Sequence, residues 1–258
     1  MGTIAVTGLA VTAVKGMRMR VVDAIELGSD GACGNRRFFV IDDRDRMVNG
    51  KVIGALQTVI ADYDRATERL TLDFPDGSRV SESLLEGAPI TARFFSRQVE
   101  GCLVEGPWAA ALSDHLGQPL RLVRPVSAVD RGAIGAASLI SRASLERLAR
   151  EAGIDAVDAR RFRMLIEIDG VPAHAEDQWV GAEVRVGQAL VRFEGHVGRC
   201  LITSRDPDTG EIDLPTLDLL RGYRGDVDAT EALPFGIYGR VLEAGAVRVG
   251  DPVAPIEP

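Results

Sequence analysis

The first hundred residues of this chain are a series of short segments with the composition of β-strands, separated by turn-forming residues. Residues 69–74 alternate polar and apolar side chains and run directly into the turn sequence Pro-Asp-Gly at residues 75–77. Other strand-like segments cover residues 3–14, 20–27 and 37–42. Short strands at this spacing are typical of a barrel or a sandwich and not of alternating strand–helix–strand units. We therefore expect a mainly β fold.

The rest of the chain adds helical segments to further short strands. A helix is expected to open near Pro107, which suits a first helical turn, and to end near Gly117. A clearer helix is expected between Ser141, a plausible N-cap, and Gly153, a natural stop. The remaining candidates are a short helix at residues 214–223 and strands within residues 164–168, 183–186, 189–193 and 235–253. The change from strands to helix places the best domain boundary near residues 95–120.

Length and charge exclude several classes of protein. The 258 residues allow one large domain or two modest ones. The net charge of −8 disfavours a nucleic-acid binder, which usually carries a basic stripe. No apolar run approaches the roughly 20 residues of a membrane span, and no secretory signal is visible at the N-terminus. Three cysteines fit a reducing compartment better than a disulfide framework. We therefore expect a cytoplasmic protein that neither spans a membrane nor binds nucleic acid.

Cys200 is the strongest candidate for a reactive residue. It follows Arg199 at the end of an apolar segment, and a fixed positive charge next to a thiol favours the reactive thiolate. Asp206 and Asp208 come shortly after it, but their Pro and Gly neighbours favour a structural turn over an acid pair for catalysis. The pattern predicts a thiol on a strand, just before a tight turn.

Other polar residues support weaker hypotheses. Cys33 and Cys102 have no partner at a useful spacing, so we expect both to be structural or incidental. His196 would share a strand face with Cys200, but zinc needs more ligands than this chain offers nearby. There is no GxSxG motif for a serine hydrolase. The glycine-containing residues 132–138 could cradle a phosphate at a helix N-terminus, although a plain flexible loop explains them as well.

A long motif in the second half of the chain resembles the signature of MOSC proteins, which are named for the C-terminal domain of the molybdenum cofactor sulfurase. The motif comprises residues 198–210, 216–224, 234–238 and 249–253, with upstream matches at residues 161–163 and 176–179. Looser matches at residues 13–15 and 35–40 resemble the companion β-barrel domain of the same family. The resemblance implies a smaller N-terminal β-barrel-like domain over residues 1–95 and a β-barrel MOSC domain with α/β elements over residues 96–258.

The resemblance also implies a cofactor and an activity. Amidoxime-reducing relatives hold a molybdenum cofactor of the molybdopterin type and reduce N-hydroxylated or N-oxide-like substrates with electrons from a separate protein. By that analogy Cys200 ligates molybdenum and is the catalytic residue. The residues that would bind the cofactor are Lys15, Arg36, Arg37, Ser138, Arg163, Arg199 and Tyr238. A phosphate-bearing cofactor independently calls for cations, and a soft metal suits a thiolate.

Two positions depart from the family pattern. Gly16 stands where the family often has Ser or Thr, and Leu165 stands where a polar side chain is common. Each removes a possible cofactor contact. Two alternatives therefore stay open: a sulfur carrier with a persulfide on Cys200, and a cofactor-binding module without turnover.

Overall fold

An eight-stranded sheet forms the larger half of the molecule. The computed structural model describes residues 3–127, 129 and 132–256. In order across the sheet, the strands are β19 (Val253–Pro255), β15 (Glu183–Val186), β16 (Ala189–Gly198), β17 (Pro234–Glu243), β13 (Ala137–Ser141), β14 (Ile166–Asp169), β1 (Ala5–Val11) and β2 (Arg20–Val22). Among these neighbours only β13 and β14 are parallel. One face buries a core that includes Leu139, Val191 and Ile237.

The two sides of this sheet approach each other without forming a continuous ladder. Ala5 in β1 forms an isolated antiparallel bridge with Pro252, and the amide of Val253 donates to the carbonyl of Ile4 at 2.9 Å. In the described residues this contact is a bridge and not a paired strand, so the sheet curls but is not a closed barrel. The expected mainly β class is confirmed, whereas the expectation of closed barrels is wrong.

The smaller half holds two further sheets around a second core. A five-stranded sheet has the order β10 (Leu85–Phe94), β11 (Arg97–Glu105), β12 (Arg121–Pro125), β5 (Phe39–Ile41) and β6 (Met47–Val48). A three-stranded sheet has the order β7 (Ile60–Asp64), β8 (Arg69–Asp73) and β9 (Arg79–Ser83). Helix α1 (Trp108–Leu116) packs into their core through Trp108, which is fully buried and donates from its indole nitrogen to the carbonyl of Leu70 at 3.0 Å.

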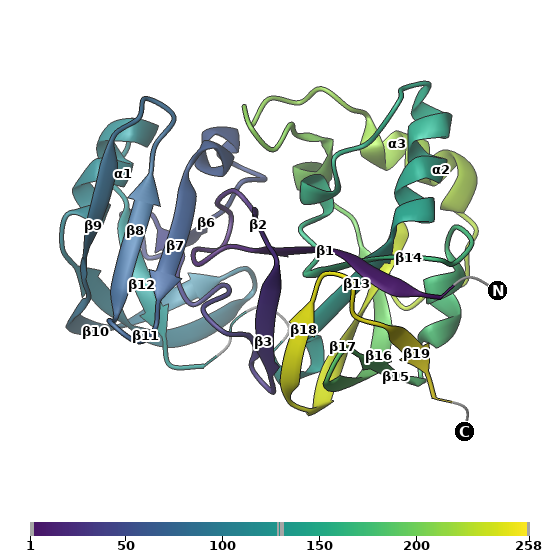
Figure 1. Cartoon of the computed structure of the whole chain (residues 1–258). Helices are drawn as coiled ribbons and strands as arrows, with labels where there is room; N and C mark the ends of the chain where they lie inside the picture. The colour runs from purple at the N-terminus through teal and green to yellow at the C-terminus, as the bar shows by residue number, and fades with distance from the viewer. Residues whose placement is uncertain (1–2, 128, 130–131, 257–258) are drawn as a thin grey trace.

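Strands from both ends of the sequence also pair with each other. A small sheet combines β18 (Gly245–Arg248) with β3 (Ala24–Gly28) and β4 (Gly31–Ala32). Strands β1 and β2 belong to the large sheet, while α1, β11 and β12 belong to the smaller half (Figure 1). In both halves, strands that precede residue 95 thus pair with strands that follow it. The division into domains at residue 95 stays a prediction.

Local capping chemistry explains the helices beside the large sheet. Helix α2 (Arg142–Ala152) begins after Ser141, whose hydroxyl accepts from the amide of Ser144 at 3.2 Å, and it ends at Gly153, whose φ is +68°. Both predicted boundaries are confirmed. Helix α3 (Thr216–Arg224) packs beside α2 (Figure 1). The 3-10 turns are η1 (Gly54–Thr58), η2 (Gly132–Gly135), η3 (Ala159–Phe162), η4 (Ala175–Trp179) and η5 (Leu201–Ser204). In the described part of the chain, none of the helices has the length and apolar character that a membrane crossing requires.

Candidate functional site

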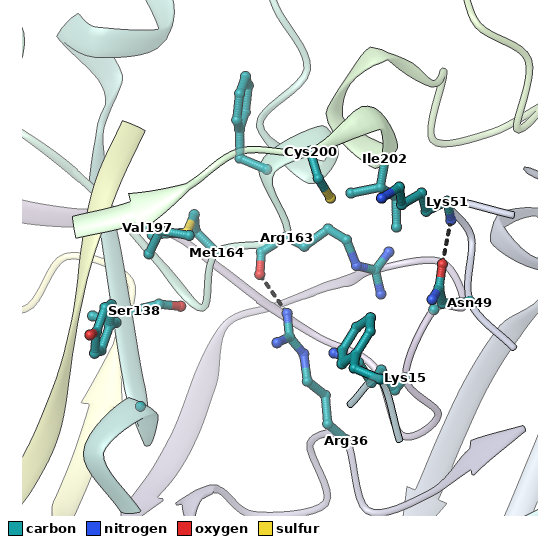
Figure 2. A pocket seen from close by; sticks show the side chains of 15 residues that line it. Lys15, Arg36, Asn49, Lys51, Ser138, Arg163, Met164, Val197, Cys200 and Ile202 are labelled. Atoms are coloured by element: carbon teal, nitrogen blue, oxygen red, sulfur yellow. Dashed lines mark hydrogen bonds between the residues drawn. The ribbon is translucent and has the colours of Figure 1, made fainter. Parts of the chain in front are cut away.

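A cavity of about 220 Å³ lies between the two halves of the molecule. Loops of the smaller half contribute Lys15, Arg36 and Lys51, and the half with the eight-stranded sheet contributes Arg163 and Cys200. In Figure 2 the Cys200 thiol and the Arg163 guanidinium point into the same space. A smaller recess of about 50 Å³ lies beside it, and Arg36 and Arg163 line both. The thiol that the sequence singles out therefore faces a real cavity.

The lining of this cavity carries positive charge only. Lys15, Arg36, Lys51 and Arg163 line it, and no Asp or Glu does so among the described residues. The chain has only two lysines, and both are in this lining, although the protein as a whole has a net charge of −8. Such a cluster of cations in an acidic protein favours the binding of an anionic ligand in this cavity.

Backbone carbonyls hold the two arginines in place. Arg36 donates from Nη2 to the carbonyl of Arg163 at 2.8 Å, and Arg163 donates from Nη2 to the carbonyl of Met17 at 2.7 Å. Both arginines have a left-handed backbone, with φ of +49° and +56°. Non-glycine residues in this region cost free energy, and such positions concentrate at functional sites.

Ion pairs and a helix cap fix the segment that precedes Arg163. Asp158 caps η3 by accepting from the amide of Arg160 at 2.8 Å. Hydrogen bonds from Arg160 to Asp158 and Asp208 raise the pKa of that guanidinium. Arg161 is paired with Asp213, with Nη1–Oδ1 at 2.6 Å. Carboxylates thus neutralise Arg160 and Arg161, whereas the side chain of Arg163 points into the cavity.

Cys200 lies just past a strand and not on it. Strand β16 ends at Gly198, and Cys200 is the exposed N-cap residue of η5. Its carbonyl accepts from the amide and from the hydroxyl of Thr203, both at 3.0 Å, which fixes the backbone under the thiol. The predicted strand position is therefore wrong by two residues, but the predicted neighbouring turn is present. The side chain of Asp206 accepts from the amide of Asp208 at 2.9 Å, which confirms the predicted structural turn.

The other residues predicted for the site fall into two groups. Ser138 and Tyr238 line the cavity and are paired across β13 and β17. Arg37 does not line it; it borders a separate recess that Cys33 also lines. Arg199 is also absent from the lining, because its guanidinium donates to backbone oxygens of residues 162 and 235. Cofactor contacts of all these residues stay predictions.

Three other sequence hypotheses can be compared with the structure. Residues 132–138 are not next to a helix N-terminus, because β13 separates η2 from α2. His196 is buried and its amide donates to the hydroxyl of Thr230 at 2.7 Å, so it does not share a strand face with Cys200 at the cavity. Cys33 is exposed and Cys102 is half-buried, and neither forms a disulfide.

The two departures from the family pattern have structural reasons in this chain. Gly16 has φ of +94°, and a Cβ there would lie 2.8 Å from the Cδ2 of Leu56. Any side chain would therefore be strained at this position. Leu165 is buried in the core of the large sheet, where its amide donates to the hydroxyl of Ser138 at 3.0 Å.

The lining residues that sequence reasoning missed include Asn49, Lys51 and Phe95. The side chain of Asn49 accepts from the amide of Lys51 at 2.8 Å, as is common in Asx turns (Figure 2). The Asn-Gly pair at residues 49–50 signals a turn in the sequence. The turn alone does not reveal that the following lysine reaches a cavity.

Comparisons with known proteins agree with the motif. Residues 127–254 match the model of the MOSC domain family. Mouse "Mitochondrial amidoxime-reducing component 1" is 38% identical over 125 residues, covering 45% of this chain and 35% of the relative. Human "Mitochondrial amidoxime reducing component 2" is 40% identical over 98 residues, covering 36% of this chain and 29% of the relative. The chain thus spans about a third of the length of these curated relatives.

Among solved structures, the YUAD protein from Bacillus subtilis aligns with a TM-score of 0.47 at 12% identity, covering 98% of this chain and 94% of that one. YiiM from Geobacillus stearothermophilus aligns with a TM-score of 0.38 at 17% identity, covering 67% of this chain and 73% of that one. The family match, together with the relatives above, identifies residues 127–254 of this chain as a MOSC domain.

Proposed function

We propose that this protein is a molybdenum-cofactor-dependent oxidoreductase that reduces N-hydroxylated or N-oxide-like small molecules. One observation carries the proposal: an exposed thiol, Cys200, faces a cavity lined by four cations and by no described carboxylate. The names of the related amidoxime-reducing proteins support this reaction class. Because three cysteines are present and none forms a disulfide, we also propose a reducing compartment such as the cytoplasm.

The side chains of the cavity fit a molybdopterin-type guest. Such a cofactor carries a phosphate, and Lys15, Arg36 and Arg163 are the cations that would hold it. The Ser138 hydroxyl adds a polar group to the same lining. Cys200 would provide the thiolate, which suits a metal that already has sulfur ligands. When bound, the cofactor supplies the two-electron chemistry.

The proposed reduction needs an external source of electrons. Two electrons and two protons convert an N-hydroxyamidine to an amidine, the N–O bond breaks, and water leaves. We propose that a separate electron-transfer protein supplies the electrons. The protein's own part is to bind and orient: the carbonyl-anchored arginines form a fixed cationic wall, so little reorganisation is needed when an anion binds.

The test starts with protein produced in a host that makes the cofactor. We expect stoichiometric molybdenum and reduction of an N-hydroxyamidine by an artificial reductant. Cys200→Ser should abolish turnover while the thermal unfolding midpoint stays near that of the wild type, because the side chain is exposed. Cys33→Ser is the matched control, an exposed cysteine outside this lining. Normal turnover by Cys200→Ser would refute the proposed role.

The same exposed thiol favours a second candidate, sulfur transfer through a persulfide on Cys200, since a persulfide must be accessible to its acceptor. Cyanide-labile sulfur on Cys200 in protein without molybdenum would support it. Stoichiometric molybdenum without amidoxime reduction would instead support a cofactor-binding module without turnover.

A further inference from the structure

The tip of the β10–β11 hairpin has an unfavourable sequence for its geometry. Phe94 pairs with Arg97, so Phe95 and Ser96 form a two-residue loop. Phe95 has φ of +55°, whereas the first position of such a loop is usually Gly, Asn or Asp. A bulky aromatic side chain with positive φ is a genuine outlier.

The strain at Phe95 coincides with the cavity. The described non-glycine residues with positive φ number seven, and three of them, Arg36, Phe95 and Arg163, line the cavity. Local rules are broken most often where function requires it. A glycine at residue 95 would relieve the strain but would remove the ring from the cavity mouth. The sequence therefore keeps a ring here at a cost in stability.

The Phe95 ring contacts neighbouring side chains and also remains exposed to solvent. It is 59% exposed although it belongs to the lining of a cavity. The buried ring of Phe94 meets it edge-on, with centroids 5.2 Å apart. The ammonium of Lys15 lies 5.8 Å from the Phe95 centroid and 5.6 Å from that of Phe94. These contacts orient the ring, and its exposed surface is available for a ligand.

The surroundings of this ring narrow the class of ligand. Phe162, Val197 and Ile202 add apolar surface to the same lining. Aromatic rings gain from stacking beyond simple burial of area. The two lysines of the lining disfavour a cationic ring by like-charge repulsion. The combination suits a planar aromatic group that is neutral or anionic.

We propose that Phe95 is a specificity-determining residue that stacks on the aromatic ring of the N-hydroxylated substrate. The inference rests on the proposed function for the identity of the reacting group. It adds the substrate class, aromatic over aliphatic N-hydroxyamidines, and it assigns the selection to the hairpin tip. The reacting N–O group would then point inward toward Cys200.

Two probes that differ only in this group test the proposal. Benzamidoxime carries a phenyl group where acetamidoxime carries a methyl group. Their binding to molybdenum-loaded protein is measured by calorimetry without reductant, so the readout does not need turnover. Phe95→Gly should weaken benzamidoxime binding about fivefold to tenfold, as expected for loss of an aromatic contact, and should leave acetamidoxime within about twofold. Phe95→Tyr should bind both probes like the wild type.

Folding is followed in the same variants. Because glycine adopts positive φ without strain, Phe95→Gly should have a thermal unfolding midpoint equal to or above that of the wild type. The control is Leu85→Gly, which removes a similarly exposed apolar side chain, 66% exposed, from the other end of β10. It should leave both affinities unchanged. A lower midpoint for Phe95→Gly, or equal loss for both probes, would overturn the proposal.

Failure of this inference can be distinguished from failure of the proposed function. If reductant is added and neither amidoxime is reduced, but benzamidoxime binding still depends on Phe95, the ring selects aromatic ligands and the proposed reaction is wrong. If both amidoximes are reduced and Phe95→Gly keeps the wild-type ratio of their kcat/KM values, the reaction stands and the role of Phe95 is wrong.

Discussion

Arg199 donates from Nε to the backbone oxygen of Phe235 at 2.8 Å, and its Nη2 donates to the same oxygen. Its Nη1 donates to the carbonyl of Phe162 at 2.8 Å. Phe162 directly precedes Arg163, and Arg199 directly precedes Cys200. One guanidinium therefore ties together the backbone segments that present the cavity's thiol and one of its cations. This makes Arg199 a positioning residue.

The first prediction follows from the shape of that guanidinium. Arg199→Lys keeps the charge but cannot form the forked contact with two carbonyls. We expect the free energy of unfolding to fall by about 1.5–3 kcal/mol, the scale of a hydrogen bond to a charged group. Denaturant unfolding measures this, and Arg221→Lys, an exposed arginine on α3, is the control. Unchanged stability combined with loss of molybdenum would show instead that Arg199 contacts the cofactor directly.

The second prediction concerns the ion pair between Arg224 of α3 and Asp177 of η4. Arg224 is 4% exposed and pairs with Asp177, with Nη2–Oδ2 at 2.6 Å, while its Nε donates to the carbonyl of Pro234 at 2.6 Å. Arg224→Met leaves the half-buried carboxylate of Asp177 without its cation and removes the buried hydrogen bond to Pro234. We expect a loss of about 3–5 kcal/mol in the free energy of unfolding.

A double-mutant cycle isolates this pair. Arg224→Met combined with Asp177→Leu removes both charges, so the double variant should be more stable than the sum of the two single losses predicts. Denaturant unfolding of all four proteins provides the measurement. Strict additivity would mean that the carboxylate is hydrated once the arginine is gone, contrary to the expectation.

The third prediction is a pH dependence that comes from His174. Burial, together with the charges of Arg224 and Arg147, lowers the pKa of this imidazole from its usual 6.5 to about 3. Above pH 6.5 the imidazole is neutral in both the folded and the unfolded state. Between pH 6.5 and 3 only the unfolded state binds the proton, so the free energy of unfolding falls as the pH is lowered. Burial raises the pKa of nearby Glu176, which acts in the opposite direction.

A variant separates the two contributions. His174→Asn keeps a residue type that tolerates the observed φ of +64° but removes the titrating ring. Its free energy of unfolding should lose less on going from pH 6.5 to 4 than that of the wild type. One proton limits the difference in slope to about 1.4 kcal/mol per pH unit. Parallel curves for the two proteins would contradict the assignment to His174.

The elements of the fold that were predicted correctly depend on local chemistry. Ser141 and Gly153 bound α2 because an N-cap hydroxyl and a left-handed C-cap act within one helical turn. The open edge of the large sheet could not be predicted in this way. Whether the segments around β1 and β19 form a ladder depends on residues at opposite ends of the chain. In the described residues they are joined by an isolated bridge between Ala5 and Pro252 and by a few backbone hydrogen bonds beside it, and not by a paired strand.

The candidate site, like the fold, could be predicted only in part. The motif located Cys200 and the cavity arginines, but it did not reveal where neighbouring side chains point. Arg199 turns to carbonyls about 36 residues away in the sequence, and its adjacency to Cys200 did not reveal these contacts. Lys51 and Phe95 reach the cavity because the two halves of the molecule pack together. That packing is a tertiary property with no signal in a short sequence window.

The final prediction concerns Lys15 and Lys51, the only lysines of the chain. Both line the cavity, so a bound anionic cofactor should shield their amines from solvent. An amine-reactive reagent should label both more slowly in molybdenum-loaded protein than in protein from a host without the cofactor. Labelling of the same two lysines after unfolding is the control, and its rate should be equal in the two preparations. Lys51→Gln should speed cofactor loss by about twofold to fivefold, the scale of a single partly solvated charge pair, and the difference should shrink in high salt because exposed charges are screened. Equal labelling in loaded and empty protein would mean that the anion binds elsewhere, because ammonium groups beside a bound anion cannot react as freely as those in an open cavity.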